Sequence, residues 1–172
     1  MTTHKLLQTL CVLLFFCLSA AGVSAAPFVS RHGYSVTPPP GWSVHPGRTG
    51  GDDVVIDYTK NLAADGAPNF RVNLSPVASS VTLEALKPFV LARYARKFPG
   101  LVIKSQTFSA LGGVRDLDLV LLQPRHGILL RFRQVYVLKN GFAYIFSAAY
   151  LEKAHARYDP VLAQMLASVR WK

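Results

Sequence analysis

The basic residues of this sequence offer its clearest means of doing chemistry. Arg93, Arg96 and Lys97 fall on one side of a predicted helix, and no acidic residue lies three or four positions from any of them. Cations without such neighbours can steer an anionic partner and fix its orientation. The alternative is a solvated helix face. We predict that these three residues contact a binding partner.

A second basic group lies on predicted strands. Arg131 and Arg133 alternate with apolar residues, so both project from one face of a strand, beside Tyr150 of the next strand. Paired guanidinium groups form bidentate hydrogen bonds with anions, and this triad is a candidate anion-binding pocket. The alternative is an ion pair between Arg133 and Asp118, with Arg131 laying its apolar stem along the surface.

Catalytic patterns are weak. Arg-His-Gly occurs at residues 31–33, near a terminus, and at 125–127, in a predicted hairpin loop. A histidine phosphatase needs further arginines and a second histidine on a larger α/β fold. The sequence contains neither a Gly-x-Ser-x-Gly elbow nor a phosphate-cradling loop before a helix. We therefore expect a protein that is not an enzyme and has no cofactor; an uncharacterised hydrolase is the alternative.

Metal ligands are also sparse. Asp52, Asp53 and Asp57 could bind a hard cation, but a solvated loop followed by a strand face explains them better. The histidines beyond the N-terminal segment lack the short spacing of a zinc site; they are His32, His45, His126 and His155. We expect no metal site, with ligands assembled across the fold as the alternative.

A signal peptide is predicted at the N-terminus. Lys5 precedes an apolar run from Leu6 to Leu18, which is too short to span a bilayer. Small residues then lead to Val23-Ser24-Ala25, which fits a signal-peptidase site. Cleavage after residues 1–25 leaves one domain, residues 26–172. We expect this domain in the periplasm or outside the cell, or in a lumen if the organism is photosynthetic.

The mature domain is free of thiols and strongly basic. Cys11 and Cys17 both lie in the predicted signal peptide, and Phe15-Phe16 before Cys17 does not fit a lipid anchor. The formal charge of +10 falls to +9 when Lys5 is removed. This excess favours anionic surfaces such as lipid headgroups, acidic glycans or acidic proteins; a purely solubilising charge is the alternative. Nucleic acid is not an expected partner because the chain is exported.

An antiparallel meander forms the centre of the predicted fold. Four strand-like runs follow one another: Leu101–Leu111, Val114–Gln123, Ile128–Leu138 and Phe142–Tyr150. Asn140-Gly141 suits a two-residue hairpin, because that turn needs positive φ at both positions. Short strands precede the meander, at residues 34–36, 42–44, 54–59 and 70–74.

Two helices flank the meander. Thr82 is a credible N-cap of the first, and Pro88 predicts either a kink or a later start at Pro88 itself. Asp159 is expected to cap the second helix, with Pro160 at its first position.

The strand register places apolar residues on both faces of the sheet. Around Asn140-Gly141, Val137 lies opposite Tyr144 on one face, and Tyr136 lies opposite Ile145 on the other. Both faces must therefore be covered, which predicts an α+β fold, a three-layer α/β/α sandwich around a central antiparallel sheet. Treating Pro124–Gly127 as a four-residue loop also sets Asp118 against Arg133, Leu119 against Phe132 and Leu121 against Leu130.

This order of elements resembles the PsbP/DcrB-like superfamily, which includes extrinsic PsbP proteins of photosystem II and bacterial DcrB-type envelope proteins. The resemblance covers the mature chain and includes Tyr34-x-Val36, Pro40-Gly41-Trp42 and the C-terminal Ser168-Val169-Arg170. It implies a non-catalytic binding or assembly module with a sheet between helices.

Two functions follow as hypotheses. The first is an exported, monomeric accessory protein that docks an envelope or membrane-associated protein partner through its basic helix face. The second is a small-molecule or lipid carrier, with a cavity between the sheet and a helix lined by Phe132, Tyr136 and Ile145.

Overall fold

The computed structural model describes residues 26–47, 52–58 and 68–172. The predicted signal peptide lies outside the described residues, as does the side chain of Asp52. The elements are β1 (Phe28–Val29), β2 (Tyr34–Val36), β3 (Trp42–Pro46), β4 (Asp52–Tyr58), β5 (Asn69–Pro76), α2 (Leu83–Lys97), β6 (Val102–Leu111), β7 (Val114–Arg125), β8 (Ile128–Lys139), β9 (Phe142–Leu151), the 3-10 helix η2 (Glu152–Ala154), α3 (His155–Ala167) and β10 (Arg170–Trp171).

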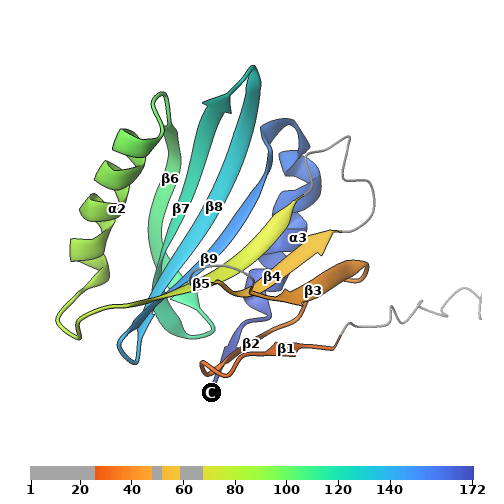
Figure 1. Ribbon diagram of the computed structural model, residues 1–172, viewed down its shortest axis with the longest axis vertical. Coiled ribbons are helices and arrows are strands. Elements are labelled where there is room, and N and C mark those ends of the chain that lie inside the picture. The colour runs from red at the N-terminus through yellow and green to blue at the C-terminus, as the bar shows by residue number, and fades with distance from the viewer. Residues whose placement is uncertain (1–25, 48–51, 59–67) are drawn as a thin grey trace, which may run out of the picture.

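Seven of the strands form one antiparallel sheet in the order β3-β4-β5-β9-β8-β7-β6. Helices α2 and α3 lie on opposite faces of this sheet (Figure 1). On one face, Leu83 and Val90 of α2 join buried side chains of β7 and β8. On the other, Tyr158 and Leu162 of α3 join the main core, which includes Phe146 of β9. The predicted three-layer α/β/α arrangement is therefore confirmed. Each face of the sheet carries apolar side chains, which a packed helix removes from water.

The β8–β9 hairpin has the predicted register. Val137 lies opposite Tyr144, and Tyr136 lies opposite Ile145. Asn140 and Gly141 have φ values of 51° and 76°, as a two-residue turn of this kind requires.

The register predicted between β7 and β8 is wrong by two residues. Leu121 lies opposite Phe132, not Leu130, and Leu119 lies opposite Gln134. The turn is His126-Gly127, with φ of 47° and 78°, because a two-residue loop with positive φ matches the strand twist better than the expected four-residue loop. A shift of two residues keeps every side chain on its predicted face.

Helix α2 begins at Leu83, and Thr82 caps it by accepting a hydrogen bond of 3.2 Å from the backbone N–H of Ala85. The predicted alternative of a start at Pro88 is therefore wrong, since Pro88 lies inside the helix. Helix α3 begins at His155, five residues before Pro160, the predicted first position, so Pro160 lies in its second turn. The carboxylate of Asp159 accepts hydrogen bonds from side chains instead of capping the helix.

A second sheet, in the order β1-β2-β10, joins the two ends of the domain. The Pro-Gly-Trp segment is a tight turn, in which the Trp42 N–H donates to the Pro39 carbonyl at 3.2 Å and Gly41 has φ of 81°. Ser168 Oγ accepts a hydrogen bond from the Thr37 N–H at 2.8 Å. Two of the three motifs of the family resemblance, Pro40-Gly41-Trp42 and Ser168-Val169-Arg170, therefore act structurally, by fixing the chain around β2.

Candidate binding site beneath helix α2

A cavity of about 420 Å³ lies between α2 and the sheet. Cavities of roughly 300–1,000 Å³ with apolar walls and a few polar groups are the usual form of small-molecule sites. Phe132, Tyr136 and Ile145 all line it, so the cavity of the carrier hypothesis is present where the sequence predicted it. The described residues that line it are Asn73, Ser75, Val77, Leu86, Phe89, Val90, Arg93, Tyr94, Lys97, Phe98, Leu101, Leu121, Gln123, Phe132, Gln134, Tyr136, Ala143, Ile145 and Ser147.

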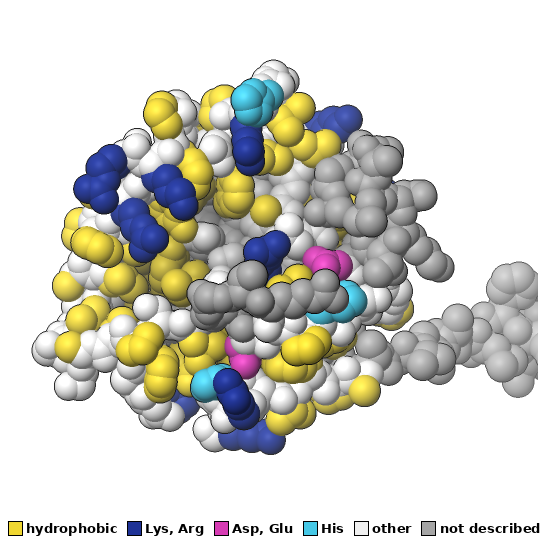
Figure 2. All heavy atoms as spheres, viewed as in Figure 1, with side chains coloured by type: hydrophobic (Ala, Val, Ile, Leu, Met, Phe, Trp, Pro, Cys, Tyr) yellow, Lys and Arg dark blue, Asp and Glu magenta, His cyan; other side chains and the backbone are white. Residues whose placement is uncertain are grey.

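One flank of α2 forms the upper wall and the mouth of the cavity. Phe89, Arg93 and Lys97 are spaced four residues apart, so they follow one another along a single flank. All three are exposed, and Phe89 has 65% of its surface exposed. Figure 2 shows basic side chains gathered over α2 beside hydrophobic ones.

The floor contains a closed group of polar side chains. Gln134 Oε1 accepts hydrogen bonds from the hydroxyls of Tyr136, at 2.6 Å, and Tyr94. Gln134 Nε2 donates to Ser147 Oγ at 3.3 Å. Burial raises the pKa of Tyr136, and the neighbouring Tyr94 raises it further. Tyr136 therefore stays a neutral hydrogen-bonding group at physiological pH.

Sequence reasoning missed Tyr94, Gln134 and Ser147 as site residues. A signal was available, because Gln134 interrupts the apolar face that Phe132 and Tyr136 define. The confirmed β8–β9 register also places Gln134 opposite Ser147.

The three predicted partner-binding residues differ in their position relative to the cavity. Arg93 and Lys97 line the cavity, whereas Arg96 is exposed outside it. Among the described residues, none of the three forms an ion pair, although Lys97 lies over the ring of Phe98 with its Nζ 5.3 Å from the ring centre. None of the described residues that line the cavity is acidic, so Arg93 and Lys97 make this part of its rim positively charged.

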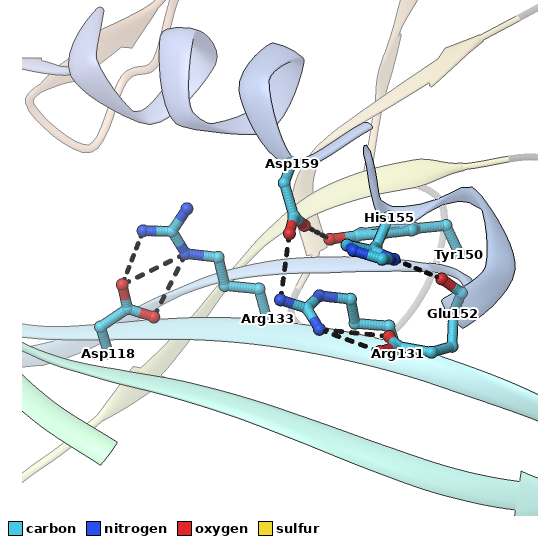
Figure 3. Close-up of polar contacts among 7 residues, drawn as sticks. All are labelled: Asp118, Arg131, Arg133, Tyr150, Glu152, His155 and Asp159. Carbon is cyan, nitrogen blue, oxygen red and sulfur yellow. Dashed lines mark hydrogen bonds and ion pairs between the residues drawn. The ribbon is translucent and has the colours of Figure 1, made fainter. Parts of the chain in front are cut away.

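The predicted anion-binding triad lies on the opposite face, next to α3 (Figure 3). Arg131 bonds Glu152 at 3.1 Å and Asp159 at 3.0 Å, and Arg133 bonds Asp118 at 2.6 Å. The ion-pair alternative for Arg133 is thus confirmed, although the pair is diagonal, because Asp118 lies opposite Val135.

These carboxylates set the electrostatics around the triad. The hydroxyl of Tyr150 donates to Asp159 (Figure 3), and burial raises the pKa of Tyr150. Burial alone lowers the pKa of Arg131, but Asp159 and Glu152 outweigh it and raise this pKa. Anion binding here stays a prediction, and an anion would have to compete with three carboxylates for two guanidinium groups.

Asp53, one of the candidate cation ligands, has a structural role. Its carboxylate accepts hydrogen bonds from Ser30 Oγ at 2.5 Å and from the Tyr34 hydroxyl at 2.7 Å, and so ties β4 to the segment around β2. His32 Nε2 lies 3.8 Å from the same carboxylate. Within residues 26–47, 52–58 and 68–172, no group of three or more His, Cys, Asp or Glu residues could hold a metal ion. In the same ranges no helix is long and apolar enough to cross a membrane.

No protein-family model and no curated protein sequence matches the chain. Solved structures do. Cyanobacterial PsbP (CyanoP) from Synechocystis sp. PCC 6803 superposes with a TM-score of 0.67 at 17% identity, covering 91% of this chain and 99% of that one. LpqN of Mycobacterium tuberculosis, described as involved in cell envelope biogenesis, gives 0.61 at 16% identity, with coverage of 87% and 86%. The Saccharomyces cerevisiae Ran-binding protein Mog1p gives 0.60 at 9% identity, with coverage of 86% and 96%.

These likenesses define the class of protein to which the fold belongs. The chain has the α+β fold shared by PsbP-like and Mog1-like proteins, and the resemblance to the PsbP/DcrB-like superfamily is confirmed at the level of the fold. Identities this low transfer neither partners nor site residues.

Proposed function

We propose that this protein is an exported, non-catalytic accessory protein that docks an anionic protein partner in the cell envelope. The docking surface is the α2 basic face, which we define as Phe89, Arg93, Arg96 and Lys97. The observation that carries the proposal is the exposure of Phe89 beside three cations that form no ion pair among the described residues.

The composition of this face suits an interface. Aromatic residues and arginine are enriched at the centres of protein interfaces, and unpaired cations accelerate encounters with acidic surfaces. Arg96 and Lys97 lie in the last turn of α2, where cations also offset the helix dipole. That stabilising role explains the two charges but not the exposed ring of Phe89.

Two further observations support the proposal. The fold is shared with a protein described as Ran-binding, which shows that this architecture can serve protein recognition. The predicted signal peptide and the envelope connection of LpqN favour the envelope as the compartment. We expect the protein to be a monomer and its binding partner to be a different protein.

The test is the triple variant Arg93→Glu, Arg96→Glu and Lys97→Glu. Crosslinking in the native compartment should capture a defined partner with the parent protein, and the variant should associate with that partner at a rate lower by about tenfold or more. The matched control reverses three basic residues elsewhere on the surface, Arg125, Lys153 and Arg170, which are all exposed. A folded triple variant that keeps the same partners at the same rate would remove the α2 basic face from consideration.

The cavity beneath α2 favours a second candidate function, carriage of a small molecule or lipid. Docking needs only the exposed side chains of the α2 basic face, three of which also line the cavity, whereas carriage needs the apolar volume behind them. Arg96 and Ser75 separate the two functions, because Arg96 lies outside the cavity, whereas Ser75 lines it from strand β5 and is not part of the α2 basic face.

A further inference from the structure

We infer that the cavity beneath α2 binds a single-chain anionic amphiphile, a medium-chain carboxylate of which laurate is the probe. The apolar chain lies along the sheet and the carboxylate lies between Arg93 and Lys97. This inference rests on the carrier function, the second candidate, and stands independently of docking.

The volume sets the size of the ligand. At roughly 30 Å³ per water-sized group, a cavity of about 420 Å³ has room for about 14 non-hydrogen atoms. A twelve-carbon carboxylate has that size. A two-chain phospholipid is several times larger and could insert only one of its chains.

The walls set the chemistry of the chain. Leu86 and Val90 of α2 lie above, while Leu121, Phe132 and Ile145 lie on the sheet. Phe132 and Ile145 are only half-buried, so each retains apolar surface for a ligand to cover. Covering such surface is the main source of affinity for an alkyl chain, about 0.8 kcal/mol per methylene group.

The polar side chains of the floor do not favour binding of the ligand headgroup there. Gln134 already bonds Tyr94, Tyr136 and Ser147, which occupies both lone pairs of its Oε1 and one N–H of its Nε2. An anionic headgroup would find only neutral donors at this group, whereas Arg93 and Lys97 lie at the rim. The polar end is therefore directed to the rim.

The rim sets the charge of the headgroup. Arg93 and Lys97 are one helical turn apart on the same flank, where Cβ atoms are separated by about 5–6 Å. A carboxylate can receive two parallel hydrogen bonds from a guanidinium group and a third from the ammonium. Because none of the described lining residues is acidic, a cationic amphiphile is repelled, and a neutral one forms no ion pair with the rim.

Phe89 fits the same arrangement. Its ring lies at the mouth beside Arg93 and is largely exposed. A bound alkyl chain would give this ring an apolar surface to cover.

The experiment measures laurate binding to the purified, exported protein by titration calorimetry, at concentrations where laurate is monomeric. One molecule should bind per protein, with a dissociation constant below about 100 µM. Dodecanol should bind at least tenfold more weakly, and dodecyltrimethylammonium should not bind. The double variant Arg93→Gln and Lys97→Gln should weaken laurate binding at least tenfold while leaving dodecanol binding unchanged.

The test uses two cavity-filling variants, so that misfolding of one of them does not leave the inference untested. Ile145→Trp fills the cavity from the floor, and Ser75→Trp fills it from an exposed lining position that the fold tolerates more easily. Both should abolish laurate binding, whereas Leu129→Trp, an exposed apolar position outside the cavity, should not. Thermal unfolding of each variant confirms that it is folded.

Several outcomes would overturn the inference. These are failure of the parent protein to bind laurate, equal binding of dodecyltrimethylammonium, and undiminished binding to a folded Ser75→Trp variant. Loss of partner crosslinking in Ser75→Trp, with no laurate bound by the parent, would instead assign the cavity to a side chain of the protein partner. Arg96→Glu separates the two functions, because it should slow partner docking and leave laurate binding unchanged.

Discussion

At the scale of single residues, two neighbouring aspartates on β7, Asp116 and Asp118, have opposite effects on the stability of the fold at neutral pH. Asp118 is paired with Arg133 at 2.6 Å. Asp116 is only 2% exposed and accepts a hydrogen bond of 2.7 Å from Ser109 Oγ. Burial raises the pKa of Asp116 above its ordinary value, Asp118 adds to the increase, and the bond from Ser109 opposes it. The charged form of Asp116 therefore reduces stability at neutral pH.

We predict that Asp116→Asn stabilises the protein at pH 7. Since the folded-state pKa lies above the unfolded one, the native parent binds its proton more tightly and gains stability as pH falls from the folded pKa toward the unfolded pKa. The variant lacks this gain. Its unfolding temperature should exceed that of the parent by about 2–4 °C at pH 7, and the difference should shrink toward pH 4.

The measurement is thermal unfolding followed by circular dichroism between pH 4 and 8. Asp118→Asn is the matched control, because it leaves Arg133 without its ion-pair partner and should lower the unfolding temperature at pH 7. A destabilised Asp116→Asn variant at pH 7 would contradict the assignment.

At the scale of elements, the sequence predicts those whose signal is local. The β8–β9 register follows from Asn140-Gly141, and the start of α2 follows from Thr82. The predicted β7–β8 turn is wrong, because Pro124 is typical of a loop although it lies within strand β7, one residue before its end. The early start of α3 was missed, because Asp159 bonds Arg131 and Tyr150 across the fold and is not available as a cap.

The candidate site also has parts that local sequence signals predict and parts that they do not. The sheet side of the cavity was predictable, since Phe132, Tyr136 and Ile145 follow from strand alternation. The sequence does not predict that Arg93 and Lys97 line the cavity while Arg96 lies outside it. That separation depends on which flank of α2 faces the open side of the sheet. Strand β10 is only two residues long and has no local signature, since its partner β2 lies at the other end of the domain.

We predict that Trp171→Ala destabilises the domain by about 3 kcal/mol. The Trp171 ring packs edge-on against Tyr144, with ring centres 5.0 Å apart, and its Nε1 donates to the Leu111 carbonyl at 2.8 Å. Gly112 also depends on this region, because a Cβ there would lie 2.9 Å from the Val169 carbonyl oxygen.

Urea unfolding checks this prediction. Arg170→Ala is the matched control on the same strand, since Arg170 is exposed and its guanidinium bonds only nearby backbone carbonyls. The control should lose less than about 1 kcal/mol. Equal losses in the two variants would show that β10 acts through its backbone alone.

At the scale of the whole molecule, the two edges of the large sheet differ. Strand β3 is short and ends at Pro46. Strand β6 has ten residues, all exposed except Leu111, and they include Val102 at 53%, Ile103 at 42% and Phe108 at 39%. A long apolar edge can pair with another chain. The pairing of β6 shifts between Ile103 and Ser105, so Lys104 lies at a bulge that interrupts this edge.

We predict that Lys104→Val increases aggregation. Removing the charge leaves a continuous apolar segment on the exposed edge, and light scattering on heating should rise earlier and faster than in the parent. Lys104→Arg keeps the charge and should behave like the parent. Unchanged scattering in Lys104→Val would show that the bulge alone protects the edge.

The position of Trp171 in the aromatic cluster has a consequence for the order in which the domain can fold. Tyr34, Tyr144 and Phe146 all contact its ring, and they come from β2 and β9, so the middle of the main core stays incomplete in any stretch of the chain that lacks Trp171. The meander of β6 to β9 can pair early, because its contacts are local in sequence, but the aromatic cluster forms only when β10 has paired with β2. Closure of the β1-β2-β10 sheet is therefore a late step in folding, and the same tryptophan that stabilises the finished domain completes it.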